Sequence, residues 1–364
     1  MIIKYKENWE ETKKRMDAFW NKEYIDRCCL SIKLRKDKSD LSYNSDPLVL
    51  SKSEYTLEET RTDSDYIFRH FDHYTKNTIH LAEAIPSLMP GFGVAAQACY
   101  FGAKQIHAPD TIWFESVIDE PDINKLVYDK DEVALNAHKK LTSDLSERAK
   151  GLFMVGMNDN CGIIDALSNL RDNAALLVDM VDNPEFVEAA RDKITDVWKK
   201  TQKQFYDLSK GSNDGGSSHS WMQTWSRGIH GQLQCDFSVM ISPAFYERFV
   251  LPELEACTSF YDNSTYHLDG QEQIRHLDLI LSVKRLDNIQ WTAVAGQPRM
   301  SNFIDVFHKI QKAGKGLVLA PDLDEVPFLL KNLSHKGLII VVSGIKDIDE
   351  ANDLIKLAEK CAHL

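Results

Sequence analysis

The amino-acid sequence predicts an α/β protein built as a (β/α)8 TIM barrel with an N-terminal helical extension. Short apolar segments typical of buried parallel strands alternate with longer amphipathic helical patterns along the second half of the chain. These units share no sequence period, which disfavours a solenoid. No Gly-x-Gly-x-x-Gly or P-loop motif follows any of the strands, which disfavours a nucleotide-binding doubly wound sheet. A chain of 364 residues is long enough for one large barrel domain.

Residues 1–78 are expected to form the extension, packed on the barrel. Within it, residues 7–26 place Trp, Met and Phe near helical spacing, and residues 28–34 form an apolar run that reads as a strand. A polar loop precedes a second, charged helix at residues 54–76.

Residues 79–364 are expected to form the barrel itself. After a loop rich in turn-forming residues, the predicted strands lie at residues 152–157, 232–238, 265–269, 289–291, 317–321 and 338–344. The helices predicted between and after them lie at residues 163–179, 184–209, 243–259, 276–283, 303–313, 324–333 and 348–362.

Composition narrows the classes of partner. The formal net charge of −12 disfavours sequence-independent binding to nucleic acid, which requires a dense positive surface. No signal peptide and no run of 18 apolar residues is visible, so we expect neither secretion nor a membrane span. The seven cysteines are scattered without a C-x-x-C motif, which favours free thiols and a cytoplasmic location.

Polar side chains follow several of the predicted strands, where a barrel places its ligand site. They are Asn158, Asn160, Asp236, Ser238, His267, Asp269, Trp291, Asp322, Asp324 and Ser343. His267 and Asp269 share one face of a strand, because side chains alternate along it. A neutral imidazole beside a carboxylate can bind a metal, transfer a proton or hold a polar ligand. For Asp322, Asp324 and Ser343, capping of the next helix is an equal alternative.

A second polar and aromatic group follows a Gly/Ser-rich segment at residues 211–218. It comprises His219, Trp221, Trp225, Arg227 and His230. Such a segment beside aromatic and basic residues is typical of a ligand-facing loop or lid. The alternative is a surface excursion with structural tryptophans.

The segment from Ile241 to Pro252 reads Ser-Pro-x-x-Tyr-x-x-Phe-x-x-Pro after its first residue. It resembles a segment of the uroporphyrinogen decarboxylase superfamily, which includes the corrinoid-dependent methyltransferases that act with coenzyme M. The order of the following strands is similar as well, and the resemblance covers roughly residues 80–364. It implies a (β/α)8 barrel with its site at the carboxyl ends of the strands.

The decarboxylase branch of the superfamily fits the sequence less well. Its Arg-rich N-terminal motif has no counterpart here, and residues 81–95, which resemble the loop with its catalytic Asp, contain no Asp. Arg227 and Arg275 are too few to hold a porphyrinogen with eight carboxylates.

The methyltransferase branch holds zinc with a His-x-Cys pair and a later Cys. The resemblance places the pair at His267 and Asp269, so Asp stands where the family has Cys. The later Cys is missing near Ser343, and Cys235 or His219 could replace it. Zinc also accepts carboxylate oxygen, so the resemblance still implies a zinc site.

These observations together predict a methyltransferase-type enzyme that acts on a small polar substrate. The expected catalytic residues are His267, Asp269 and Asp236, with His267 and Asp269 as metal ligands or as an acid/base pair. The expected substrate-binding residues are Asn158, Asn160, His219, Trp225, Arg227, Trp291 and Asp322. Cobalamin is implied only on a separate corrinoid protein, because the chain has no Asp-x-His-x-x-Gly motif. The alternative is a metal-free protein for a sugar-like ligand that stacks on tryptophans, with uroporphyrinogen decarboxylation third; the oligomeric state stays open.

Overall fold

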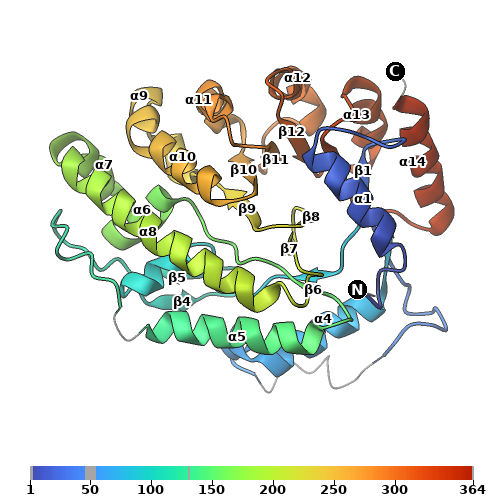
Figure 1. The fold of residues 1–364 in the computed structure, drawn as a ribbon, viewed down its shortest axis with the longest axis horizontal. Helices are drawn as coiled ribbons and strands as arrows, with labels where there is room; N and C mark the ends of the chain where they lie inside the picture. The colour runs from blue at the N-terminus through green and yellow to red at the C-terminus, as the bar shows by residue number, and fades with distance from the viewer. Residues whose placement is uncertain (1–2, 46–54, 130–131, 363–364) are drawn as a thin grey trace.

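The computed structural model describes residues 3–45, 55–129 and 132–362, and it shows a mixed α/β fold around a central sheet (Figure 1). The sheet has seven hydrogen-bonded strands in the order β2-β1-β13-β12-β11-β10-β9. All of its neighbours are parallel except β1 and β2, which are antiparallel. Parallel pairing with helical crossovers is what the alternating strand and helix patterns predicted.

The strands are β1 (Cys29–Arg35), β2 (Thr78–Ala82), β3 (Ser87–Leu88), β4 (Gln105–His107), β5 (Ile112–Phe114), β6 (Met154–Val155), β7 (Ser217–His219), β8 (Thr224–Ser226), β9 (His230–Leu233), β10 (Asn263–Asp269), β11 (Asn288–Thr292), β12 (Gly316–Leu319) and β13 (Leu338–Val342). Three pairs stand outside the central sheet, namely β3 with β6, β4 with β5 and β7 with β8. The hydrogen-bonded strands of the described residues therefore do not form one continuous closed ring.

The α-helices are α1 (Trp9–Trp20), α3 (Glu59–Thr62), α4 (Ser64–Lys76), α5 (Val133–Ala149), α6 (Ile163–Arg171), α7 (Asn173–Asp182), α8 (Pro184–Ser209), α9 (Pro243–Phe245), α10 (Leu251–Phe260), α11 (Leu277–Ser282), α12 (Ile304–Lys312), α13 (Val326–Asn332) and α14 (Ile348–Cys361). A π-helical stretch from Tyr246 to Val250 joins α9 to α10, where the sequence predicted one continuous helix. None of the helices in the described part of the chain is long and apolar enough to cross a membrane.

The first 78 residues do not form helices alone. Strand β1 lies between β2 and β13, so part of the expected extension is built into the central sheet. The pairing of Cys29 with Ile339 and of Ile32 with Val342 continues the parallel pattern of the later strands.

Helix α1 closes the end of the sheet where several strands begin. Its residues Trp9, Met16, Phe19 and Trp20 are buried in a small hydrophobic cluster. The other members of that cluster come from the sheet and the adjoining loops, namely Ile3, Cys29, Ile85, Met154, Met222, Trp225, Val318 and Ile339. A second, much larger cluster fills the space between the sheet and the surrounding helices.

The Gly/Ser-rich segment is not a lid. Ser217 and Ser218 belong to β7 and are fully buried. Asn213 bonds the backbone of Val155 twice, with 3.0 Å from the Val155 nitrogen to Oδ1 and 2.7 Å from Nδ2 to the Val155 oxygen. The expectation of an open ligand-facing loop was wrong, because small residues here permit close packing against β6.

Candidate functional site

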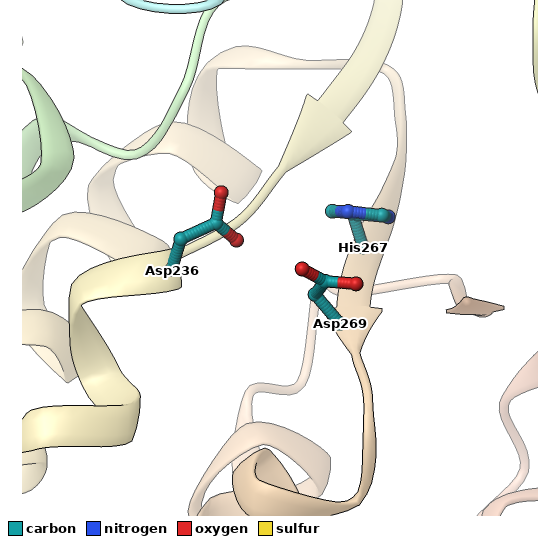
Figure 2. A group of neighbouring side chains, drawn as sticks. All are labelled: Asp236, His267 and Asp269. Atoms are coloured by element: carbon teal, nitrogen blue, oxygen red, sulfur yellow. The ribbon is translucent and has the colours of Figure 1, made fainter. Parts of the chain in front are cut away.

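Three candidate side chains converge at the carboxyl ends of β9 and β10. Asp236 begins the 3-10 helix that follows β9, while His267 and Asp269 lie on β10. One ligand atom from each of the three residues lies within 4.8 Å of the other two. Figure 2 shows the three side chains gathered around one space. Among the described residues, this is the group of His, Cys, Asp and Glu side chains spaced to hold one metal ion.

Strand pairing explains why these side chains meet. Tyr266 is opposite Leu233 on β9 and Ile289 on β11, and both neighbours run parallel to β10. Tyr266 and Leu268 face the large hydrophobic cluster, so His267 and Asp269 face the other side.

Asp165, near the start of α6, fixes the backbone that carries Asp236. Its carboxylate accepts hydrogen bonds from the backbone nitrogens of Asp236 at 3.0 Å and Phe237 at 2.9 Å. It also accepts one from Gly162 at 3.1 Å, which caps its own helix. A single buried carboxylate thus ties the turn after β9 to the beginning of α6.

The hydrogen bonds of Gln290 determine how His267 is oriented. The Gln290 amide nitrogen donates to the Trp291 carbonyl and to the Thr292 hydroxyl, each at 2.9 Å. Its amide oxygen therefore faces Nδ1 of His267, to which it is hydrogen-bonded. Because that oxygen only accepts, Nδ1 carries the proton and Nε2 keeps its lone pair.

Burial lowers the pKa of His267, although the bond to Gln290 and the charge of Asp269 oppose this effect. Burial favours the neutral imidazole, which is the form that binds metal ions. Asp236 responds in the opposite direction: burial, together with Asp165, Asp269 and Asp159, raises its pKa to about 8. A carboxyl group in that range holds or releases a proton near neutral pH.

Two glutamines connect Asp236 to a further carboxylate that the sequence did not single out. Gln234 donates to Asp236 at 2.8 Å, and Gln232 donates to both Gln234 and Asp159. Burial raises the pKa of Asp159 to about 6, against the hydrogen bond from Gln232.

An aromatic wall adjoins His267. The ring centroids of Trp221 and His267 are 5.1 Å apart, and those of Trp221 and His219 are 4.9 Å apart, both in edge-to-face contact. Burial lowers the pKa of His219 to about 4, so this imidazole is neutral.

Several buried polar groups of this region have no hydrogen-bond partner among the described residues. They are both ring nitrogens of His219 and the side-chain amides of Asn158 and Asn160. Buried polar groups are normally paired, so each of these is a candidate contact for a bound molecule.

A cavity of about 300 Å³ opens beside Asp236. Asp165 and Asn169 line it from α6, and Trp113 and Phe114 line it from β5. The cavity gives a small molecule room next to the convergent group.

Two predicted substrate-binding residues lie at the opposite end of the sheet. Trp225 packs edge-to-face on Trp9 at 5.1 Å between ring centroids, and its indole nitrogen donates to the Asn213 carbonyl at 2.8 Å. Arg227 is exposed and pairs with Asp17 of α1 at 2.6 Å. The structure does not bring either residue to the convergent group.

Two other predicted substrate-binding residues, Trp291 on β11 and Asp322 after β12, do not face the convergent group. Trp291 is buried against Phe303 and Phe307, at 4.5 and 5.6 Å between ring centroids, so it packs under the helices. Asp322 is exposed and lies 3.7 Å from Arg299, in a cluster of surface charges. Cys235, considered as a replacement ligand, is buried in the large hydrophobic cluster.

The sequence carried a signal for the residues that were missed. Gln290 and Thr292 alternate along β11 and so share one face of that strand. Gln232, Gln234 and Asp236 have the same spacing, although β9 ends at Leu233. The missing information was the register that places Gln290 beside His267.

No family model and no curated protein matches the chain. Solved structures do match. One of them is a methyltransferase from Methanosarcina mazei, with a TM-score of 0.58 and 10% sequence identity over 96% of this chain and 98% of that chain. At that identity the likeness shows that the two chains share a fold over nearly their full lengths.

Proposed function

We propose that this protein is a metal-dependent, methyltransferase-type enzyme of the uroporphyrinogen decarboxylase superfamily that acts on a small polar substrate. The observation that carries the proposal is the convergence of Asp236, His267 and Asp269 within 4.8 Å. The fold shared with a protein named as a methyltransferase supports the choice of reaction class.

We propose that the strands which carry the site form a barrel. The backbone nitrogen of Gly156 bonds the Leu88 carbonyl at 2.6 Å, and that of Met157 bonds the Ser218 carbonyl at 2.8 Å. These bonds connect the β3–β6 pair to β7. The three strands follow β2 and precede β9, which are the two edge strands of the central sheet. The bonds support a distorted (β/α)8 ring, whose ligand site lies where the strands end.

The three convergent side chains fit a zinc ion. One neutral imidazole nitrogen and two carboxylates supply nitrogen and oxygen donors, which zinc accepts. His267 would bind through Nε2, because Nδ1 is occupied by Gln290. A bound zinc ion would act as a Lewis acid and lower the pKa of a substrate group attached to it.

The three ligands would bind zinc in their deprotonated forms, so Asp236, with a pKa near 8 in the metal-free protein, would release its proton when zinc binds. Other side chains position the substrate. Asn158, Asn160 and His219 offer unpaired donors and acceptors that orient a polar substrate. A separate corrinoid protein would bring the methyl group, because the chain carries no cobalamin-binding motif of its own.

Metal analysis of the purified protein tests the proposal. About one zinc ion per chain is expected, and His267→Ala should lose it. His308→Ala is the matched control, because His308 is exposed on α12 and its ring bonds the Asn332 carbonyl, away from the candidate site. Zinc that survives His267→Ala, or a wild-type protein that binds none after zinc is supplied, contradicts the proposal.

A metal-free protein that binds a sugar-like ligand is the second candidate. The unpaired amides of Asn158 and Asn160 favour it, since sugar hydroxyls would satisfy both donors and acceptors. Trp225 and Trp291 are packed in the interior, which leaves Trp221 for stacking. Sugar binding without metal would select this candidate. Uroporphyrinogen decarboxylation stays third, because Arg227 pairs with Asp17 and Arg275 donates to a backbone carbonyl.

A further inference from the structure

The charges around the candidate site are all negative. Asp159, Asp165, Asp236 and Asp269 surround it, and Asp236 is repelled electrostatically by the other three. No Lys or Arg of the described residues forms an ion pair with any of these four carboxylates or perturbs Asp159 and Asp236. Asp165 is stabilised by three backbone N–H groups, which leaves the other three without comparable compensation.

The basic residues on the adjoining loops are engaged elsewhere. Arg275, after β10, donates to the Val239 carbonyl at 2.6 Å. Arg299, after β11, pairs with Asp324 at 2.5 Å. The cavity beside Asp236 is likewise lined by two carboxylates and several aromatic rings, without a basic residue among its described lining. An anionic substrate would therefore meet repulsion without a counter-charge.

Unpaired buried groups beside the carboxylates indicate that the region receives a ligand. His219 is only 1% exposed, neither of its ring nitrogens has a hydrogen-bond partner in the described structure, and its ring meets Trp221. Trp221 in turn meets His267 and lies beside Asp159. An indole next to a carboxylate is a combination that binds alkylated ammonium groups, through cation–π attraction and charge.

We infer that the substrate carries a methylated ammonium group, held by Asp159 and Trp221, and a second polar group that reaches Asp236, His267 and Asp269. The inference rests on the proposed function in taking those three residues as the reacting centre. A divalent ion there would balance Asp236 and Asp269, and Asp159 would remain as the counter-charge of the substrate. Methyl groups on the nitrogen reduce its hydration, so that transfer from water to the indole costs less than for a bare ammonium.

A pair of molecules with the same shape and different charge tests the inference. Choline and 3,3-dimethylbutan-1-ol differ in having nitrogen or carbon at the centre of the trimethyl group. Calorimetric titration of the zinc-loaded and the metal-free protein should show choline binding at least about tenfold more tightly, which corresponds to about 1.4 kcal/mol. Equal binding of the two, tighter binding of the neutral alcohol, or no binding of choline at either metal state overturns the inference.

Substitutions at Asp159 and Trp221 test whether these residues cause the preference for choline over the neutral alcohol. Asp159→Asn should remove most of the preference for choline, and Trp221→Leu should weaken choline more than Trp221→Phe does. Asp278→Asn is the control for the loss of one negative charge, because Asp278 is exposed on α11 and pairs with Lys309 at 2.6 Å. If Asp159→Asn does not fold by circular dichroism, the Trp221 pair decides, and an unchanged preference in both Trp221 variants counts against the inference.

The outcome separates this inference from the proposed function. Zinc that depends on His267, together with equal binding of the two molecules, contradicts the ammonium substrate alone. A preference for choline in a protein that never takes up zinc contradicts the metal site alone.

Discussion

The two ends of the central sheet differ in whether their buried polar side-chain atoms have hydrogen-bond partners. At the end closed by α1, the indole nitrogens of Trp9, Trp20 and Trp225 each have a hydrogen-bond partner within 2.9 Å. At the other end, the ring nitrogens of His219 and the side-chain amides of Asn158 and Asn160 are without one in the described structure. The chain itself pairs the indole nitrogens at the first end, whereas the unpaired groups at the second end are open to a ligand. This difference separates the part of the fold that provides stability from the part that provides chemistry.

The largest effect is expected at the closed end. Trp225→Ala removes a side chain that is 1% exposed and packs on Trp9, so it should lower the free energy of unfolding by about 3–5 kcal/mol. Denaturant unfolding measures the loss. Trp113→Ala, at a side chain that is 63% exposed, should change stability by less than about 0.5 kcal/mol. Similar losses in the two variants would contradict the structural role given to Trp225.

An intermediate effect is expected from the residue that orients His267. Gln290→Leu removes the acceptor that holds the proton on Nδ1, so zinc affinity should fall by about 10–100-fold. Gln290→Glu keeps an acceptor and should retain more of the affinity. Nitrogen NMR of His-labelled metal-free protein should show His267 leaving the Nδ1–H form in Gln290→Leu. The same tautomer in wild type and Gln290→Leu would disprove the positioning role.

The smallest effect is expected from the pH dependence of the metal-free protein. The pKa of Asp236 is raised from 3.8 to about 8 by burial and the neighbouring carboxylates. At Asp236 the folded state therefore binds more protons than the unfolded state between these values, and the contribution of this group to stability falls as pH rises from about 4 to about 8. Asp236→Asn should flatten this fall by on the order of 1 kcal/mol, because solvent near Asp236 screens much of the effect.

Thermal melting across that pH range, with and without zinc, checks the sign. Zinc should stabilise the wild-type protein most at the upper end, where the carboxylates are free of protons. A metal-free wild-type protein that gains stability between pH 4 and 8 through Asp236 would contradict the environment described for this carboxyl group.

The sequence predicted features that depend on neighbouring residues in the chain, and it missed features that depend on contacts between distant segments. Strand β10 and the shared face of His267 and Asp269 follow from alternation along one strand, and the structure agrees. Trp291 also lies on a predicted strand, but its face depends on the register with β10, which pairs Gln290 with His267 and turns Trp291 outward. Register arises from pairing across the sheet, so a single sequence does not contain it in readable form.

The same limit applies to Trp225 and Arg227. Both follow a Gly/Ser-rich segment that resembles a surface loop, yet they meet α1, about 200 residues earlier in the chain. Contacts over such separations left no local pattern. The convergence of Asp236 with β10 was predictable only because barrels place strand ends together.

The position of Trp221 between two imidazole rings makes it an optical reporter of the site. Its ring centroid is 4.9 Å from that of His219 and 5.1 Å from that of His267, close enough for the state of either imidazole to alter its emission. Subtracting the spectrum of Trp221→Phe from that of the wild-type protein isolates this signal from the other six tryptophans. Occupation of the site can then be followed by fluorescence without a labelled ligand and before any reaction has been identified.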